Sequence, residues 1–252
     1  MPLRAYGLTD KGRVRPTNED CFAIHEELGL CVIADGMGGH NAGEVAARLA
    51  VDAVVAFMRS PDERHSFGSN PARSADGNLL HEAIHRANAQ IRETAFTSFD
   101  YAGMGTTIVA ARVRDGRLTV AHVGDSRLYL VAQGRLRQVT QDDSWMASML
   151  ARDPTADPQA LEHHPLRNVL TNVVGARVRP EVHVAETTLT GGESLLLSTD
   201  GVHGVLDEDR IRQLMLEEED PQAIARSVIA AALARGSRDN CTAIVARYEA
   251  LS

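Results

Sequence analysis

Apolar residues follow two patterns along the chain: short uninterrupted runs, and positions that recur every three or four residues. The uninterrupted runs have the length of buried strands. The segments that we predict as strands are 28–34, 106–113, 117–123, 126–132, 194–198 and 241–248. Asp115-Gly116 separates two of them and is typical of a two-residue type I′ hairpin turn, and Gln133-Gly134 indicates a second turn.

Helical periodicity lies between groups of these strands. The apolar residues that share one face are Val45, Leu49, Ala53 and Phe57 in a first segment and Leu80, Ile84, Ala87 and Ile91 in a second. This spacing predicts one helix over 44–59 and another around 80–91, and a further pair is predicted over 209–217 and 221–235. Helix pairs that alternate with hairpin-linked strands favour an α+β layered domain over a βαβ parallel sheet.

Composition and charge narrow the class of protein. Of the 252 residues, 44% are hydrophobic and 24% are charged, and the formal net charge is −8. An acidic chain disfavours nucleic-acid binding, which needs a basic face, although bound cations could still admit a phosphorylated substrate. No stretch approaches the roughly 20 apolar residues of a membrane-spanning helix, and the first residues lack the apolar core of a signal sequence. We therefore expect a cytoplasmic protein with no nucleic-acid or membrane partner, and we also expect a monomer.

Acidic residues stand beside several of the predicted strands. They are Asp35 in CVIADGMGGH, Asp125 in TVAHVGDSR, Asp200 in SLLLSTDG, Asp239 in SRDNCTAIV and the pair Glu19-Asp20 in RPTNED. A single Asp-Gly is more often a plain turn, and Asp115 keeps that interpretation. Asp35-Gly36 and Asp200-Gly201 differ, because each ends an apolar run and leads into further glycine or a helix-bound loop. Acids at strand ends can converge at one rim of a sheet assembly.

If these carboxylates converge, their chemistry is constrained. An oxygen-only site suits magnesium or manganese, with water completing the shell. Two such ions can activate a water and neutralise a phosphoryl group. Phosphate-monoester hydrolysis needs up to about 10²¹-fold acceleration, whereas one general acid or base gives roughly 10²–10⁴. Metal ions would therefore carry most of the catalysis.

Six motifs resemble those of a known family. In chain order they are RPTNED, IADGMGGHNAGEVA, GMGTT, AHVGDSRLYL, LLLSTDGV and GSRDNCTAI. Together, from Tyr6 to Tyr248, they resemble bacterial protein phosphatases of the 2C type, the metal-dependent PPM family. The resemblance implies one phosphatase domain over residues 1–252. It also implies a four-layer αββα sandwich, with two antiparallel β-sheets flanked by helix pairs.

The resemblance implies two core Mn²⁺ or Mg²⁺ ions and, as in bacterial members, a third. Asp35 resembles the carboxylate that bridges the core ions, and the Gly36 carbonyl and Glu19 resemble further ligands of one of them. Asp20 resembles the acid that holds water of that shell.

Three more acids match the remaining ligand positions. Asp200 and Asp239 resemble the ligands of the other core ion, and Asp125 resembles the acid that holds the third ion together with Asp200.

Two residues match positions that face the substrate. Arg15 resembles the arginine that binds the substrate phosphate, a task for which a guanidinium fork is suited. Arg13 is interpreted as a surface charge. His40 matches the histidine of the DGMGGH motif, near the substrate. Animal relatives have a histidine directly after the first Asp-Gly, where this chain has Met37. Protonation of the leaving group would then fall to water or to His40.

Residues 141–172 resemble the flap that covers the site in bacterial members. Asp143 stands where a histidine is frequent, and Asn172 stands where an arginine is common. Gly204 stands where an aspartate often follows the second Asp-Gly. These departures change details that face the substrate and leave the implied metal ligands intact.

The resemblance implies a hydrolase that cleaves phosphoserine and phosphothreonine esters on proteins, by attack of a water activated between two metal ions, and that opposes a bacterial serine/threonine kinase. A catalytically dead binding module on the same fold would be expected to lose a metal ligand, and none is lost. The acidic charge weighs against a two-metal nuclease. A small-molecule phosphatase remains open as an alternative.

Overall fold

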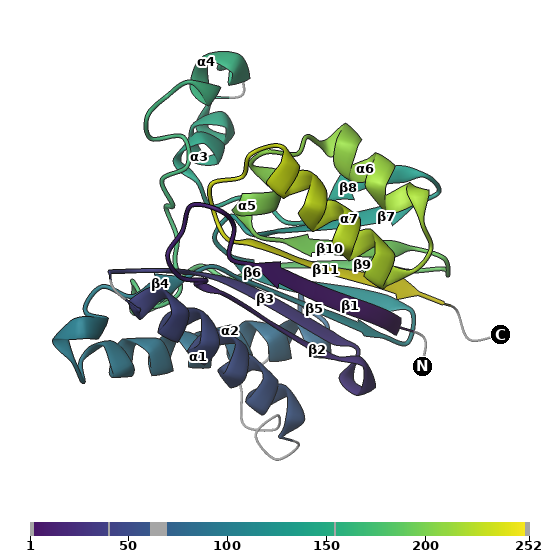
Figure 1. Cartoon of the computed structure of the whole chain (residues 1–252). Coiled ribbons are helices and arrows are strands. Elements are labelled where there is room, and N and C mark those ends of the chain that lie inside the picture. Colours follow the sequence, from purple (N-terminus) through teal and green to yellow (C-terminus); the bar gives the residue numbers. More distant parts are fainter. Residues whose placement is uncertain (1–2, 40, 61–69, 154, 250–252) are drawn as a thin grey trace.

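Two β-sheets lie face to face in the computed structural model, and helices cover the outer face of each (Figure 1). The structure describes residues 3–39, 41–60, 70–153 and 155–249, without the side chains of residues 158 and 159. The predicted αββα sandwich, with two antiparallel sheets between helix pairs, is confirmed.

The first sheet joins the two ends of the chain. Its strand order is β1-β11-β10-β7-β8. Its strands are β1 (Leu3–Asp10), β7 (Arg127–Ala132), β8 (Arg135–Gln138), β10 (Ser194–Ser198) and β11 (Cys241–Tyr248). β11 lies between β1 and β10 and pairs antiparallel with both. The end of β10 and the start of β11 therefore lie close together.

The second sheet has the order β2-β3-β5-β6-β9, with the short strand β4 also paired to β3. Its strands are β2 (Asp20–His25), β3 (Leu30–Met37), β4 (Gly105–Thr106), β5 (Ile108–Arg114), β6 (Arg117–Val123) and β9 (His183–Thr188). Asp20 lies directly opposite Asp35 on the antiparallel pair β2–β3. Asp115 and Gly116 connect β5 to β6 with φ of 50° and 71°, which confirms the predicted hairpin turn.

A helical layer covers each sheet. α1 (Ala42–Arg59) and α2 (Ala75–Ala95) pack on the second sheet, and α6 (Glu208–Glu217) and α7 (Pro221–Ala234) cover the first. The short helices are α5 (Asp200–His203), which follows β10, and the 3₁₀ turns Glu26–Leu28 and Phe99–Tyr101. Within the described residues, no helix is long and apolar enough to cross a membrane.

Two helices stand apart from the layers. α3 (Trp145–Arg152) and α4 (Pro158–Glu162) project beyond one end of the sandwich (Figure 1). The indole ring of Trp145 stacks on the imidazole ring of His164, with 4.1 Å between ring centroids and 14° between ring planes. This projecting region falls within the segment 141–172.

Three apolar clusters separate the four layers. One lies between the second sheet and helices α1 and α2, one lies between the two sheets, and one lies beneath α6 and α7. Along β3, Val32 and Ala34 belong to the cluster beneath the helices, whereas Cys31 and Ile33 belong to the cluster between the sheets. Both faces of β3 are buried, which explains why its sequence is a continuous apolar run.

The position of Asp35 differs from the sequence-based prediction. The sequence places Asp35 after a strand that ends at residue 34, but β3 continues to Met37. The strand continues because Asp35 pairs with Asp20 on β2, and Gly36 and Met37 pair with β4. Pairing with neighbouring strands, rather than apolar character, thus extends β3 into the acidic motif.

Candidate active site

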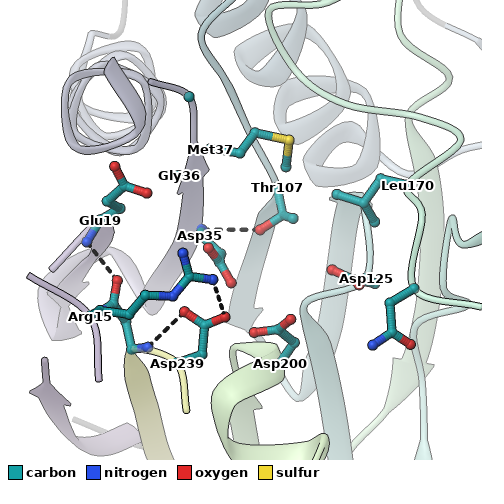
Figure 2. A pocket seen from close by; sticks show the side chains of 13 residues that line it. Arg15, Glu19, Asp35, Gly36, Met37, Thr107, Asp125, Leu170, Asp200 and Asp239 are labelled. Carbon is teal, nitrogen blue, oxygen red and sulfur yellow. Dashed lines mark hydrogen bonds and ion pairs between the residues drawn. The ribbon is translucent and has the colours of Figure 1, made fainter. Parts of the chain in front are cut away.

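Five of the six predicted acids line one pocket (Figure 2). The pocket has a volume of about 230 Å³ and is lined by Arg15, Glu19, Asp35, Gly36, Met37, Gly38, Thr107, Asp125, Asn168, Leu170, Asp200, Asp239 and Asn240. Of the predicted site residues, Asp20 does not line the pocket, and His40 lies outside the described residues. Segments far apart in the sequence therefore supply one acidic cavity.

Backbone and hydroxyl groups fix Asp35 at its place in β3. Its N–H donates to Oγ1 of Thr107 at 3.0 Å, and its carbonyl oxygen accepts from the N–H of Thr107 at 2.9 Å and from Oγ1 of Thr106 at 2.8 Å. Burial raises the pKa of the Asp35 carboxyl well above its ordinary value, and neighbouring aspartates add to this rise. The ionised form is thus costly without a compensating cation.

Asp20 lies buried beside Asp35. Its Oδ2 accepts hydrogen bonds from Oγ1 of Thr199 at 2.9 Å and Oγ1 of Thr242 at 2.6 Å. Its Oδ1 is buried and has no hydrogen-bond partner among the described residues. Burial raises the pKa of this carboxyl to about 7, although the two hydroxyl groups act in the opposite direction. One oxygen atom of Asp20 therefore remains available for a ligand.

The loop before β2 is held by Asn240. The side chain of Asn240 accepts from the N–H of Glu19 at 2.8 Å and donates to the carbonyl oxygens of Lys11 at 2.8 Å and Thr17 at 2.9 Å. These bonds fix the backbone on which Glu19 stands. A Cβ atom at Gly43 in α1 would lie 2.8 Å from the carboxyl carbon of Glu19, so glycine leaves room for this carboxylate.

Arg15 forms an ion pair with Asp239. Its Nη2 donates to Oδ2 of Asp239 at 2.6 Å, and the N–H of Asn240 donates to Oδ1 of Asp239 at 2.9 Å. The Arg15 side chain is 49% exposed, at the rim of the pocket. The hydrogen bond to Asp239 raises the pKa of Arg15. A guanidinium carries five N–H donors, so this contact leaves capacity for a bound anion.

Asp125 and Asp200 approach from the other side of the pocket (Figure 2). Asp125 follows Gly124, whose φ is 99°. A Cβ atom at Gly124 would lie 2.7 Å from Cγ2 of Thr107, so this tight turn requires glycine. Burial, followed by the charge of Asp200, raises the pKa of Asp125 to about 7. Asp200 begins α5, and burial followed by the charge of Asp239 raises its pKa as well.

Comparison with known proteins identifies the family. The model of the protein phosphatase 2C family matches residues 13–235. The chain belongs to this family. It is 31% identical over 240 residues to the serine/threonine phosphatase stp of Listeria welshimeri, covering 94% of this chain and 92% of that protein. It is 33% identical over 247 residues to the serine/threonine protein phosphatase PstP of Mycobacterium tuberculosis, covering 98% of this chain and 45% of that protein.

Solved structures of 2C-type phosphatases have the same fold. The crystal structure of the M. tuberculosis phosphatase PstP/Ppp superposes with a TM-score of 0.86 at 30% identity, covering 98% of this chain and 99% of that chain. The catalytic domain of PstP in complex with two manganese ions superposes with a TM-score of 0.80 at 30% identity, with coverages of 98% and 99%. The predictions of the family, of the fold and of a metal-dependent serine/threonine protein phosphatase are confirmed.

The donor atoms of this 2C-type phosphatase fit divalent cations. In the part of the chain that the structure describes, no three carboxylate, imidazole or thiol side chains are arranged to enclose one ion. A magnesium-type site commonly uses only one or two carboxylates and completes its shell with water. Among the residues that the structure describes, the buried Oδ1 atoms of Asp20 and Asp200 have no hydrogen-bond partner. Cations would stabilise the ionised forms that burial disfavours.

The residues that support the acids were not identified from the sequence. They are Thr107, Ser126, Thr199, Asn240 and Thr242, all within or beside the 2C-type motifs. Thr107, for example, holds the N–H of Asp35 and shares a hydrogen bond of 2.8 Å with Ser126, the residue after Asp125. Ser126, Thr199 and Asn240 each stand next to a motif aspartate, and this adjacency is the signal that would have indicated them.

Proposed function

We propose that the acidic pocket is the catalytic centre at which this 2C-type phosphatase hydrolyses phosphoserine and phosphothreonine esters on proteins. The observation that carries the proposal is the convergence of Asp35, Asp125, Asp200 and Asp239 on one pocket in a chain of this family. Closely spaced carboxylates are unfavourable unless cations neutralise them. The relatives named as serine/threonine phosphatases support this substrate class.

The pocket would hold two core divalent ions, Mn²⁺ or Mg²⁺, and a third. The ligands proposed are Asp35, Gly36 and Glu19 for one core ion, Asp200 and Asp239 with Asp35 for the other, and Asp125 with Asp200 for the third. The unpartnered Oδ1 of Asp20 would hold water beside the first ion. The related PstP structure with two manganese ions supports a core pair.

Bound divalent ions supply an acidified water for attack and positive charge against the phosphoryl oxygens. Arg15, at the rim, would donate to the phosphate from the N–H groups that Asp239 does not use. Met37 carries no proton to give to the leaving group, although it lines the pocket. Protonation of the leaving alkoxide would then fall to water or to His40, which lies outside the described residues.

We further propose that residues 141–172 form a flap within a single phosphatase domain of residues 1–252. Its two arms pair where Ser144 bridges Leu170 and where the N–H of Trp145 donates to the carbonyl oxygen of Val169 at 2.8 Å. Asn168 and Leu170, on the exit arm, line the pocket. A substrate that enters the pocket would therefore contact this segment.

We also propose an opposing kinase, an oligomeric state and a cellular location for this enzyme. Phosphoserine and phosphothreonine esters are made by kinases, so the enzyme would oppose a bacterial serine/threonine kinase, as a monomer in the cytoplasm. The net charge of −8 disfavours nucleic acid and anionic membrane as partners.

A metal-dependence assay tests the proposal. Purified protein with manganese should release phosphate from a phosphothreonine peptide, and EDTA should abolish this release. Asp35→Asn should reduce turnover to background, because it removes a charge shared by both core ions. Asp115→Asn, in the exposed β5–β6 turn, is the matched control and should retain activity. Full turnover in EDTA, or by Asp35→Asn, would contradict the proposal.

A further inference from the structure

Asp143 lies at the junction between the proposed flap and the β6–β7 turn that carries Asp125. Its backbone N–H donates to the carbonyl oxygen of Gly124 at 3.0 Å. Its carbonyl oxygen accepts from the N–H of Thr171 at 2.8 Å and from Oγ1 of Thr171 at 3.0 Å. The backbone of this residue thus links the first arm of the flap to both the β6–β7 turn and the second arm.

The carboxylate of Asp143 makes a second set of links. Its Oδ2 accepts from the N–H of Gly124 at 2.9 Å and from Nδ2 of Asn172 at 2.8 Å, and its Oδ1 accepts from Nε2 of His183 at 2.9 Å. The side chain is only 13% exposed. Burial alone would raise the pKa of Asp143, but the three donors outweigh it and hold the pKa below its ordinary value. The carboxylate is therefore charged and fully engaged.

Each of these donors belongs to a different element around the pocket. Gly124 precedes Asp125, so the bond to its N–H helps to hold the turn that carries a proposed metal ligand. Asn172 ends the exit arm two residues after Leu170, which lines the pocket. Asn172 is also tied to Glu181, because its Nδ2 donates to the Glu181 carbonyl oxygen at 2.7 Å and its Oδ1 accepts from the Glu181 N–H at 3.2 Å. His183 begins β9.

We propose that Asp143 is a positioning residue for the phosphatase reaction, which sets the Asp125 turn and the exit arm of the flap relative to each other without contacting the substrate. The inference rests on the proposed function of the pocket. Removal of the carboxylate would take the acceptor away from Gly124, Asn172 and His183 together. The Asp125 turn and the exit arm would then be coupled only through the backbone bonds of residue 143. Such a loss affects the arrangement of the reacting groups, so it should lower kcat more than it changes KM.

The test compares substitutions that remove the carboxylate with one that preserves its geometry. Asp143→Ala removes all three acceptor contacts. Asp143→Asn retains an oxygen for Gly124 and Asn172, and its amide can donate to His183, because a neutral imidazole accepts at Nε2 in its other tautomer. In this variant the carboxylate that raises the pKa of His183 is absent, which favours the neutral imidazole. The asparagine variant should therefore restore the function that alanine removes.

Glu193 provides a matched control away from the pocket. It is buried at the far end of β10 from Asp200, and its carboxylate also accepts three hydrogen bonds, each 2.8 Å long, from the N–H and Oγ1 of Thr190 and from the N–H of Gly191. Glu193→Ala should lower Tm as Asp143→Ala does, but it should leave kcat unchanged. A loss of stability alone is thereby separated from a loss of positioning.

The measurements are kcat, KM and the half-saturating manganese concentration with a phosphothreonine peptide, together with Tm. Asp143→Ala should lower kcat by about ten- to a hundred-fold, the range for residues that orient metal ligands, with KM little changed and more manganese required. Asp143→Asn should regain most of the lost kcat. Wild-type kcat in Asp143→Ala, or an equal loss of kcat in Glu193→Ala, would overturn the inference.

A second variant covers the case in which Asp143→Ala does not fold. Asn172→Ala removes the hydrogen bond between Asp143 and the exit arm, together with the two hydrogen bonds between Asn172 and Glu181. It should also lower kcat, and unchanged kcat in this variant would overturn the inference. The wild-type enzyme distinguishes the two proposals. If the wild type shows no manganese-dependent turnover, the proposed function fails, whereas a normal wild type with an unaffected Asn172→Ala refutes the role of Asp143 alone.

Discussion

Replacement of Asp125 by asparagine should stabilise the metal-free protein at alkaline pH. Burial and the charge of Asp200 raise the pKa of Asp125 from 3.8 to about 7 in the folded state. The folded protein then binds this proton more tightly than the unfolded chain does. The stabilisation that comes from binding this proton is therefore present at low pH and is lost as the pH rises through about 7.

The magnitude follows from the size of the pKa shift. A rise of roughly three units, at about 1.4 kcal/mol per unit, corresponds to a penalty of at most about 4 kcal/mol for the ionised carboxyl above pH 7. Asparagine has a similar shape and no charge to desolvate, so it avoids this penalty. The gain should approach this limit only if water does not enter the pocket.

Urea denaturation in EDTA, followed by circular dichroism, measures the effect. The free energy of unfolding of Asp125→Asn minus that of wild type should be near zero at about pH 4, rise through about pH 7 and level off above it. Asp115→Asn is the surface control, because its side chain is 92% exposed in the hairpin turn, so it should not show this gain. With manganese present the order should reverse, because the ion binds the ionised wild-type site. A difference that does not vary with pH would refute the reasoning.

Two further substitutions test the roles proposed for Arg15 and Glu19. Arg15→Ala should lower kcat/KM for a phosphopeptide by about ten- to a hundred-fold, because a charge-assisted hydrogen bond is worth about 1.5–3 kcal/mol. Arg13→Ala is the control, and steady-state kinetics should show little change for it. Equal losses of kcat/KM in the two variants would mean that the arginine is wrongly assigned. Gly43→Ala should keep or raise Tm, since alanine favours the helix, yet weaken manganese binding measured by calorimetry, because its Cβ displaces the carboxylate of Glu19. Gly39→Ala, where a Cβ would meet no atom within 4 Å, is the control, and unchanged manganese affinity in Gly43→Ala would contradict the assignment of Glu19.

The strands that the sequence predicted are those in the middle of the sheets. Each of these strands, β3, β5, β6, β7, β10 and β11, has at least two neighbouring strands, and their apolar runs were recognised. The strands β1, β2, β8 and β9 were not predicted, and they are the edges of the two sheets. An edge strand such as β9, with the sequence HVAETT, is only partly buried and has no continuous apolar run. Its pairing with β6 is a tertiary interaction that a local pattern does not encode.

The candidate site, too, could be predicted only in part from the sequence. The motifs indicated which acids to consider, but their convergence depends on how two sheets align at one end. Asp143 illustrates the limit. The sequence indicates only that it lies in the flap, where a histidine is frequent, whereas its contacts with Gly124, Asn172 and His183 come from segments up to 40 positions away. Such a network follows from the fold and cannot be derived from the spacing of residues.

The stacked pair Trp145 and His164 has a consequence for how this protein can be observed. Trp145 is the single tryptophan of the chain, and it lies in the projecting helix α3 rather than in the sandwich. Tryptophan emission therefore reports on the environment of that segment, whereas far-ultraviolet circular dichroism reports on the sheets and the large helices. The two signals coincide only if both parts unfold together. A melting curve recorded by fluorescence alone would measure the release of the indole from His164, and the sandwich could remain folded after that transition is complete.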